Sequence, residues 1–562
     1  MSMISEPVSD DTTLLLPTKS DGTDYNIVET NYDQKFIATT VLSTIIQWMQ
    51  RSESYKPLRL TVAAGAGRGK SYLIHQLTKA IRKMFNRNDV VLTAAPTGAA
   101  AFNIHGRTCH NSFGISPDNP NSDISAAVKA RLIQELRYIV AIFIDERSLL
   151  SAKVFGAAER NVAMTCHGGG KQHLDWGGVP VVIIWGDDYQ LPSVEKGAFE
   201  CLSQQRLPYC RTNIEISGMR QFLNFAENVI TMTKNQRAND NEFIALQDRI
   251  RLGQGTDDYI NTLLSLSLNN LSTSDRLVLE KAPTTMCIFA TRQKCSDSNL
   301  ARLREQHSSE NPVAFIRSVI KSSYKNKDDT LPKMTVLCRG AKVAIKGRNF
   351  CPKIGLFNGA IGTVIEIVYN IGESPNLGHF PQYILVAFPS YNGPPFDPQH
   401  VNWVPIPTIS TVKDKATVKY VPLELSYSKT IHKFQGYQAG PNNEIKNIIC
   451  DPGTSKHESL FPGLLYTSLS RATTIGTATE RQRSAIFFEY ISSDRIKNLT
   501  TSKDGSTYKT IQKRTAWTNH LSKNEIEHSE FSNEELDELL VKYTTLHFNM
   551  TELDTVTSLN TN

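Results

Sequence analysis

A short glycine-rich segment near the N-terminus has the residue types of a phosphate-binding loop. Residues 64–71 read Ala-Gly-Ala-Gly-Arg-Gly-Lys-Ser and stand between an apolar, strand-like run and a segment with helical periodicity. Glycines let the backbone turn so that its N–H groups face a phosphate at the positive end of the following helix. In such a loop Lys70 reaches the β- and γ-phosphates of a nucleotide, and the Ser71 hydroxyl binds Mg²⁺. The candidate nucleotide-binding residues are Gly65, Ala66, Gly67, Arg68, Gly69, Lys70 and Ser71, preceded by Ala64, where the general pattern has glycine.

Two further strand ends carry the polar side chains that nucleotide hydrolysis needs. One apolar run ends in Asp145 and Glu146, and a second leads into a loop that contains Gln190. Buried strands seldom end in paired carboxylates unless a cation is near, so Asp145 is predicted to hold Mg²⁺ together with Ser71. Glu146 is predicted to orient and deprotonate the attacking water, and Gln190 to contact the γ-phosphate or that water.

The elements that position these residues alternate between strand and helix. Apolar residues recur at helical spacing in 32–51 and 71–85, and strand-like runs occupy 58–62, 90–94, 139–144 and 179–185. This alternation predicts an α/β fold with a doubly wound parallel sheet.

The composition and residue pattern of the sequence change in three other regions. Residues 335–425 contain short alternating runs with many Val, Gly and Pro residues, which predicts a small β-barrel. Residues 1–30 are polar and are expected to be disordered. Beyond residue 500 the chain is polar again, with one amphipathic helix predicted over 533–548.

Taken in order, the motifs resemble those of superfamily 1B helicases, and most closely the petite-integration-frequency (PIF) type of DNA helicase, which is akin to RecD and Dda. The resemblance covers about residues 31–500 and rests on the segments 31–34, 64–71, 95–110, 145–149, 186–194, 235–237, 289–292, 339–343, 355–362, 428–436 and 466–472. The chain departs from the family pattern at His105, where glycine is usual. It departs again at Arg147, within Asp-Glu-Arg-Ser-Leu instead of Asp-Glu-Ile-Ser-Met, and at Asp188, where an aromatic residue is common.

The resemblance implies an α/β fold with two RecA-like motor lobes, an inserted SH3-like β-barrel and polar tails. The expected boundaries are 1–30 for an acidic tail, 31–275 for lobe 1A, 276–334 and 426–500 for the two parts of lobe 2A, 335–425 for the barrel (domain 2B) and 501–562 for a polar acidic tail. A strand-splitting pin or wedge is expected near residues 114–126.

The resemblance also implies the cofactors ATP and Mg²⁺ and further site residues. Gln34 would read the adenine, while Arg237 and Arg471 would be the two arginine fingers on the γ-phosphate. Single-stranded DNA would be contacted by Thr97, Gly98, Thr108, His110, Thr430, His432 and Lys433. For His110 and His432 the alternative is a structural histidine that bonds a turn.

The implied activity is an ATP-dependent DNA helicase that moves 5′-to-3′ on single-stranded DNA, in replication, repair, recombination or telomere maintenance. Its expected partners are single-stranded DNA and duplex junctions. One alternative keeps the fold but acts on RNA or RNA–DNA hybrids. Another is a non-catalytic nucleic-acid-binding scaffold, which the presence of Lys70, Glu146 and both arginines disfavours, because degenerate motors usually lose one of them.

Charge and cysteine content agree with a nucleic-acid partner in a reducing compartment. The net charge of +6 is unevenly distributed: residues 1–30 hold six acidic residues and one lysine, and residues 501–562 hold ten acidic and six basic residues. The remaining basic body suits a polyanion, and the acidic tails are candidate protein-docking segments. The nine cysteines form no Cys-x-x-Cys pair, which disfavours zinc and disulfide frameworks. Without a signal peptide or a long apolar run, a nuclear or cytoplasmic location is expected, and a mitochondrial one is less favoured.

Overall fold

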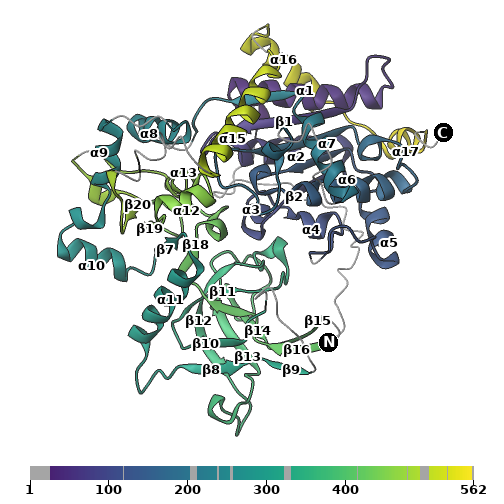
Figure 1. Cartoon of the computed structure of the whole chain (residues 1–562). Coiled ribbons are helices and arrows are strands. Elements are labelled where there is room, and N and C mark those ends of the chain that lie inside the picture. The colour runs from purple at the N-terminus through teal and green to yellow at the C-terminus, as the bar shows by residue number, and fades with distance from the viewer. Residues whose placement is uncertain are drawn as a thin grey trace.

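The computed structural model describes most of the chain (Figure 1). The described residues are 26–117, 119–202, 212–236, 240–253, 257–321, 331–413, 416–477, 479–493, 496, 506–527 and 530–559. Two parallel-sheet lobes lie side by side, and an antiparallel unit lies next to the second lobe. None of the helices in these ranges combines the length and the apolar composition that a membrane span requires.

Lobe 1 is a six-stranded parallel sheet in the order β3-β2-β4-β5-β1-β6. Its strands are β1 (Leu58–Ala64), β2 (Val91–Ala95), β3 (Arg107–Thr108), β4 (Ala141–Ile144), β5 (Val181–Gly186) and β6 (Val229–Met232). Its helices are α1 (Tyr32–Met49), α2 (Lys70–Phe85), α3 (Gly98–Asn103), α4 (Cys109–Ser112), α5 (Ala126–Glu135), α6 (Ala152–Thr165) and α7 (Asn213–Phe225).

The burial of β5 shows why its apolar run is continuous. Val181, Ile183 and Trp185 pack into the core under α1 and α2, whereas Val182 and Ile184 pack into the core under α5, α6 and α7. A parallel strand covered by helices on both faces has no solvent side, so both sets of alternate residues are apolar. The predicted doubly wound arrangement of this lobe is confirmed.

Lobe 2 contains a four-stranded parallel sheet in the order β18-β7-β19-β20. Its strands are β7 (Thr285–Phe289), β18 (Ser428–Thr430), β19 (Asn447–Asp451) and β20 (Ile486–Phe488). The helices that surround it are α8 (Asn241–Arg251), α9 (Asp257–Ser265), α10 (Thr273–Lys281), α11 (Arg292–Gln306), α12 (Ser455–Leu460) and α13 (Leu464–Leu469). Phe243 and Leu246 of α8 and Ile260 and Leu263 of α9 belong to its core. Packing therefore places α8 and α9 with lobe 2, before the boundary expected at residue 275.

An antiparallel unit is inserted between β7 and β18. Its main sheet has the order β14-β13-β12-β11-β17. The strands are β11 (Lys342–Ile345), β12 (Ile361–Val368), β13 (Tyr383–Ala387), β14 (Trp403–Pro407) and β17 (Leu423–Leu425). Smaller sheets pair β8 (Ala314–Arg317) with β10 (Met334–Leu337), and β9 (Val319–Lys321) and β15 (Ile409–Lys413) with β16 (Ala416–Tyr420). In the described residues β8 pairs with β10 and β9 with β16, so both strands lie with this unit although they precede residue 335. Its SH3-like character stays a prediction.

The C-terminal segment differs most from its predicted form. In place of a polar tail with one helix, it forms α15 (Ser506–Lys523), α16 (Asn533–Thr544) and α17 (Met550–Leu559). Leu536, Leu540 and Leu553 join the core around α1, and Trp517 joins the core under α6 and α7. The few apolar residues of this segment stand among many acidic ones. The average composition therefore did not indicate that one face of these helices is buried.

The same segment also extends the sheet of lobe 1. The backbone N–H of Val229 in β6 donates to Asn524, and the N–H of Ile526 donates back to Val229, at 3.2 and 2.8 Å. Lys35 of α1 and Asp537 of α16 form an ion pair of 2.7 Å. Residues 506–527 and 530–559 therefore pack against lobe 1 as part of its core and its sheet.

Candidate functional site

The glycine-rich loop connects the carboxyl end of β1 to the first turn of α2. Gly67 and Gly69 have φ angles of +75° and +85°, in the left-handed region that glycine adopts without steric penalty. Ala64 is the last residue of β1, and its φ is not positive. An alanine therefore fits the position where the general pattern has glycine.

Two predicted site residues border this loop from different helices. Lys70 begins α2, and its Nζ donates to the carbonyl oxygen of Ala64 at 2.9 Å. Gln34, in the first turn of α1, donates from Nε2 to the carbonyl oxygen of Gly69 at 3.3 Å. Its Oε1 accepts the N–H of Asn31 in a capping box, which holds this turn against the loop. The adenine-reading role of Gln34 stays a prediction.

Other contacts to the loop come from the second lobe. Arg68 is paired with both carboxylate oxygens of Asp248 in α8, at 3.0 and 2.9 Å. The Tyr466 hydroxyl in α13 lies 3.5 Å from the backbone nitrogen of Ala66. The phosphate loop of lobe 1 thus faces lobe 2 directly.

Asp145 and Glu146 follow β4 as predicted, beside Lys70. Oδ1 of Asp145 accepts the N–H of Glu146 at 2.8 Å. Burial, together with the charge of Glu146, raises the pKa of Asp145 to about 7, against the opposing charges of Lys70 and Arg471. Glu146 is buried at φ +54°, and its Oε2 has no hydrogen-bond partner among the described residues. The buried Asp145 carboxylate near Lys70, the unpaired Oε2 of Glu146 and Ser71 at the start of α2 suit hydrated Mg²⁺ and an attacking water.

The loop after β5 brings a further acid into this buried region. Oδ2 of Asp187 accepts the Tyr466 hydroxyl at 2.6 Å, and Oδ1 lies 3.4 Å from Nε of Arg251. Burial alone would raise the pKa of Asp187, but the charges of Arg251 and Lys70 and the Tyr466 hydrogen bond hold it below its usual value. Asp187 is therefore a carboxylate that joins the two lobes.

Arg471 brings a buried positive charge from lobe 2 to lobe 1. It follows α13, and its Nη2 donates to Oε1 of Gln190 at 3.2 Å. Both side chains are almost fully buried. Its charge also acts on Asp145, which belongs to the first lobe. The structure thus brings together Arg471, Gln190 and Asp145, as the motif order predicted, and the role of Arg471 as a finger stays a prediction.

The other predicted finger, Arg237, lies outside the described residues. Its neighbour Gln236 is described, and the Gln236 N–H donates to the carbonyl oxygen of Gly67 at 2.7 Å.

Sequence reasoning missed three residues of this interface: Asp187, Arg251 and Tyr466. Asp187 and Tyr466 stand inside the motif segments 186–194 and 466–472, and Arg251 is the last residue of α8. Opposite charges in motifs that line the same interface between the lobes are the sequence feature that could have indicated these residues.

The residues of lobe 1 that are candidates for contact with single-stranded DNA lie at the carboxyl end of its sheet. Thr97 caps α3 by accepting the N–H of Ala100 at 3.3 Å. Thr108 in β3 pairs with Ala95, two residues before Thr97, and His110 follows in α4. Burial lowers the pKa of His110, which disfavours its charged form.

The helix α3 also connects this group with the candidates in lobe 2. A Cβ at Gly98 would lie 2.9 Å from the carbonyl oxygen of Asn358 in the antiparallel unit. A Cβ at Gly436 would lie 2.8 Å from the backbone nitrogen of Ala100. Lobe 1, the antiparallel unit and the segment 428–436 therefore meet around α3.

The lobe 2 candidates precede that contact in sequence. Thr430 accepts the N–H of Lys433 at 3.3 Å, and Lys433 is exposed with its Nζ 2.9 Å from Oε1 of Glu424. The His432 ring lies 5.0 Å from Phe461, and burial lowers the pKa of His432. Lys433 is thus the candidate best placed to offer a charge to a phosphate.

The three departures from the family pattern have structural explanations. His105 has a φ angle of +50°, in the region that favours glycine, and its ring lies 4.6 Å from that of His75. Arg147 and Asp188 pair with each other through two hydrogen bonds of 3.0 and 2.6 Å. Both side chains are buried, so the pair substitutes an ionic contact for an apolar one.

This pair yields a stability prediction. Arg147→Ala should lower the free energy of unfolding by about 3–5 kcal/mol, because it leaves the Asp188 carboxylate buried without its cation. The double variant Arg147→Ile/Asp188→Phe should lose less than Arg147→Ala alone. Urea unfolding of the full chain measures both, and equal losses in the two variants would contradict the pairing.

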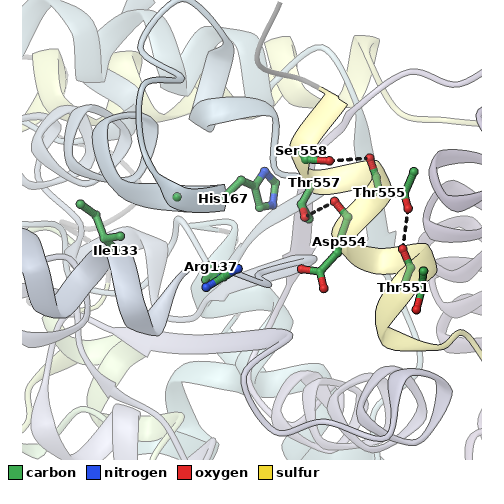
Figure 2. A pocket seen from close by; sticks show the side chains of 9 residues that line it. Ile133, Arg137, His167, Thr551, Asp554, Thr555, Thr557 and Ser558 are labelled. Atoms are coloured by element: carbon green, nitrogen blue, oxygen red, sulfur yellow. Dashed lines mark hydrogen bonds between the residues drawn. The ribbon is translucent and has the colours of Figure 1, made fainter.

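A cavity of about 700 Å³ lies away from this region, between lobe 1 and α17 (Figure 2). Arg137 and His167 line one side, and Asp554 and Thr555 line the other. None of the predicted site residues borders it, so it is separate from the candidate active site.

Comparison with known proteins agrees with this arrangement. Residues 31–260 match the family model described as PIF1-like helicase. The ATP-dependent DNA helicase Pif1 of Bdellovibrio bacteriovorus is 26% identical over 421 residues, which are 73% of this chain and 81% of that protein. The crystal structure of Pif1 helicase from Candida albicans has a TM-score of 0.59 at 21% identity, over 87% of this chain and 99% of that one. Bacteroides Pif1 bound to ssDNA has a TM-score of 0.56 at 20% identity, over 85% and 96%. The glycine-rich loop, the acidic strand end and Arg471 meet in this structure, and the chain is similar to the PIF1-like helicases, over residues 31–260 by the family model.

Proposed function

We propose that this protein is an ATP-dependent DNA helicase that moves 5′-to-3′ along single-stranded DNA. The observation that supports this most is the hydrogen bond from Arg471 of lobe 2 to Gln190 of lobe 1, beside Asp145. A site completed by both lobes can respond to their relative movement, which a motor needs.

The residues divide the chemistry between the two lobes. Lys70 would hold the β- and γ-phosphates of ATP, and Ser71 and Asp145 would hold Mg²⁺, which neutralises charge on the phosphates when bound. Glu146 would take the proton of the attacking water through its free Oε2. Arg471 would stabilise charge on the departing γ-phosphoryl group, and Arg237 would assist it.

Movement would follow from the charges at the lobe interface. Tyr466, Arg251 and Arg471 of lobe 2 contact Asp187 and Gln190 in the loop after β5. A change of charge at the γ-phosphate position would alter the strength of these contacts. Hydrolysis would therefore change the relative arrangement of the two lobes. The candidate DNA-contacting residues around α3 would move with the lobes to which they belong.

DNA binding would be directed at the sugar–phosphate backbone. Thr97, Thr108 and Thr430 offer hydroxyl groups and Lys433 offers an exposed charge, so the candidate set contains few groups that could read base edges. Backbone contacts carry little sequence information, which suits a motor that must move along any sequence.

The experiment that tests the activity is steady-state ATP hydrolysis with and without single-stranded DNA. The parent should hydrolyse ATP faster with DNA, and Lys70→Ala should hydrolyse none, because it removes the charge that holds the phosphates. Equal rates in the parent and in Lys70→Ala would overturn the proposal.

The binding mode gives a separate prediction. The affinity for single-stranded DNA should fall steeply with salt and vary little with sequence, with a log–log slope of about −0.7 per neutralised phosphate. Lys433→Ala should make the slope shallower by one such contact, whereas Lys456→Ala, at an exposed lysine of α12, should not. Fluorescence anisotropy at several salt concentrations measures the slope, and a salt-insensitive affinity would indicate base reading instead.

A further inference from the structure

The C-terminal helix α15 touches the loop that carries Gln190. Nη2 of Arg514 donates to the carbonyl oxygen of Gln190, and Nε1 of Trp517 donates to Oδ2 of Asp188 at 2.9 Å. Both donors are buried, and Trp517 is among the largest fully buried side chains. The helix therefore forms hydrogen bonds with this loop at two points, through side chains one turn apart.

The same helix also reaches lobe 2, as its central place in Figure 1 suggests. A Cβ at Gly463, the residue before α13, would lie 3.2 Å from Nη2 of Arg514. Glu458 of α12 accepts the N–H groups of Gly463 and Leu465, at 2.6 and 3.1 Å. Burial lowers the pKa of Arg514, and the charge of Glu458 opposes that shift. Arg514 therefore lies between the Gln190 loop of lobe 1 and the start of α13, the helix that precedes Arg471.

The ion pair of Arg147 and Asp188 extends this contact to the residue next to Glu146, the proposed general base. Arg147 directly follows Glu146, and Asp188 stands two residues before Gln190. Because Asp188 accepts from both Arg147 and Trp517, one carboxylate joins the loop of Glu146, the loop of Gln190 and α15. Of the three positions that depart from the family motif, Asp188 is bonded by α15 directly and Arg147 is joined to it through Asp188.

We propose that α15 is a positioning element of the ATP site, in which Arg514 and Trp517 hold the Gln190 loop in register with Glu146 and with α13. This inference rests on the proposed ATPase function. Neither residue contacts the reacting atoms in this arrangement, so both act through the loop.

The expected consequence is a loss of turnover rather than of binding. Among the described residues, no hydrogen bond or ion pair joins Lys70, Ser71 or Asp145 to α15, so they would still hold nucleotide when the Gln190 loop shifts. A displacement of about 1 Å in groups that orient the reaction can cost on the order of 100-fold in rate. Freeing the loop from α15 should therefore lower kcat and leave the KM for ATP nearly unchanged.

The test compares Arg514→Ala, Arg514→Lys and Trp517→Phe in the full chain. Arg514→Ala should lower DNA-stimulated kcat by about 10- to 100-fold, with the KM for ATP and the Kd for single-stranded DNA within about twofold of the parent. Arg514→Lys should recover part of the rate because it keeps a donor, and Trp517→Phe, which loses only the Nε1 donor, should lower kcat less than Arg514→Ala. Thr515→Ala, at an exposed position of the same helix, should match the parent.

The assays are run well below the melting temperature of each variant, so that loss of folded protein is separated from loss of turnover. Parental kcat in both Arg514→Ala and Trp517→Phe would overturn the inference. A kcat that fell only in proportion to the folded fraction, or a KM that rose with kcat unchanged, would overturn it as well. A parent that hydrolyses no ATP would instead overturn the proposed function, and the inference with it.

Discussion

Arg471→Ala should lower DNA-stimulated ATP turnover by about 10³- to 10⁵-fold, the range over which arginine fingers act. The arginine lies in lobe 2, but it donates to Gln190 and acts on Asp145, both in lobe 1. In the proposed mechanism its charge would matter most as the γ-phosphoryl group departs, because negative charge would then develop on oxygens held near the arginine. Unwinding should disappear with turnover.

Nucleotide binding should survive this change. Lys70, Ser71 and Asp145 lie in lobe 1, and among the described residues Arg471 donates to Gln190 and Ser470 rather than to any of them. Binding of a fluorescent ATP analogue and ATP hydrolysis are measured on the same preparation, with Arg483→Ala, at a largely exposed arginine of lobe 2, as the matched control. Turnover near the parental rate in Arg471→Ala would show that the lobes do not share one site.

Glu146→Gln should lower turnover by about 10²- to 10⁴-fold while ATP and DNA still bind. The amide keeps the shape of the side chain but cannot accept the proton of the attacking water. Because Oε2 has no hydrogen-bond partner among the described residues, the substitution breaks no protein contact at that atom. Loss of activity would therefore report on the chemistry rather than on folding.

The measurement is single-turnover hydrolysis with enzyme in excess over ATP, which removes product release from the observed rate. Glu305→Gln, at an exposed glutamate of α11, controls for loss of one negative charge. Hydrolysis by Glu146→Gln at the parental rate would place the general base elsewhere.

The parts of the site that depend on local sequence were predictable. The loop before Lys70 needs left-handed backbone, and glycine stands at both described positions that have it, Gly67 and Gly69. The apolar run before Asp145 is a buried strand because both of its faces are covered, and strand ends meet at one edge of a parallel sheet. For these residues, spacing along the chain determines position in space.

The parts that depend on distant contacts were not predictable from pattern. Nothing in the segment around Arg147 indicates that its partner is Asp188, or that Trp517 would bind the same carboxylate. Helix α8 follows lobe 1 in sequence, yet Phe243 packs in the core of lobe 2, a contact that the spacing of residues does not reveal. Such pairings are set by tertiary packing, which composition and periodicity do not encode.

The central claim, that ATP hydrolysis between the two lobes drives strand separation, is tested most directly by strand displacement from tailed duplexes. Duplex DNA with a 5′ single-stranded tail, a 3′ tail or no tail is mixed with the full chain and ATP, alongside matched RNA duplexes. We predict ATP-dependent displacement of the 5′-tailed DNA, with little from the other DNA substrates and none by Lys70→Ala. Absence of displacement from every tailed DNA, under conditions where the same preparation hydrolyses ATP, would contradict the account.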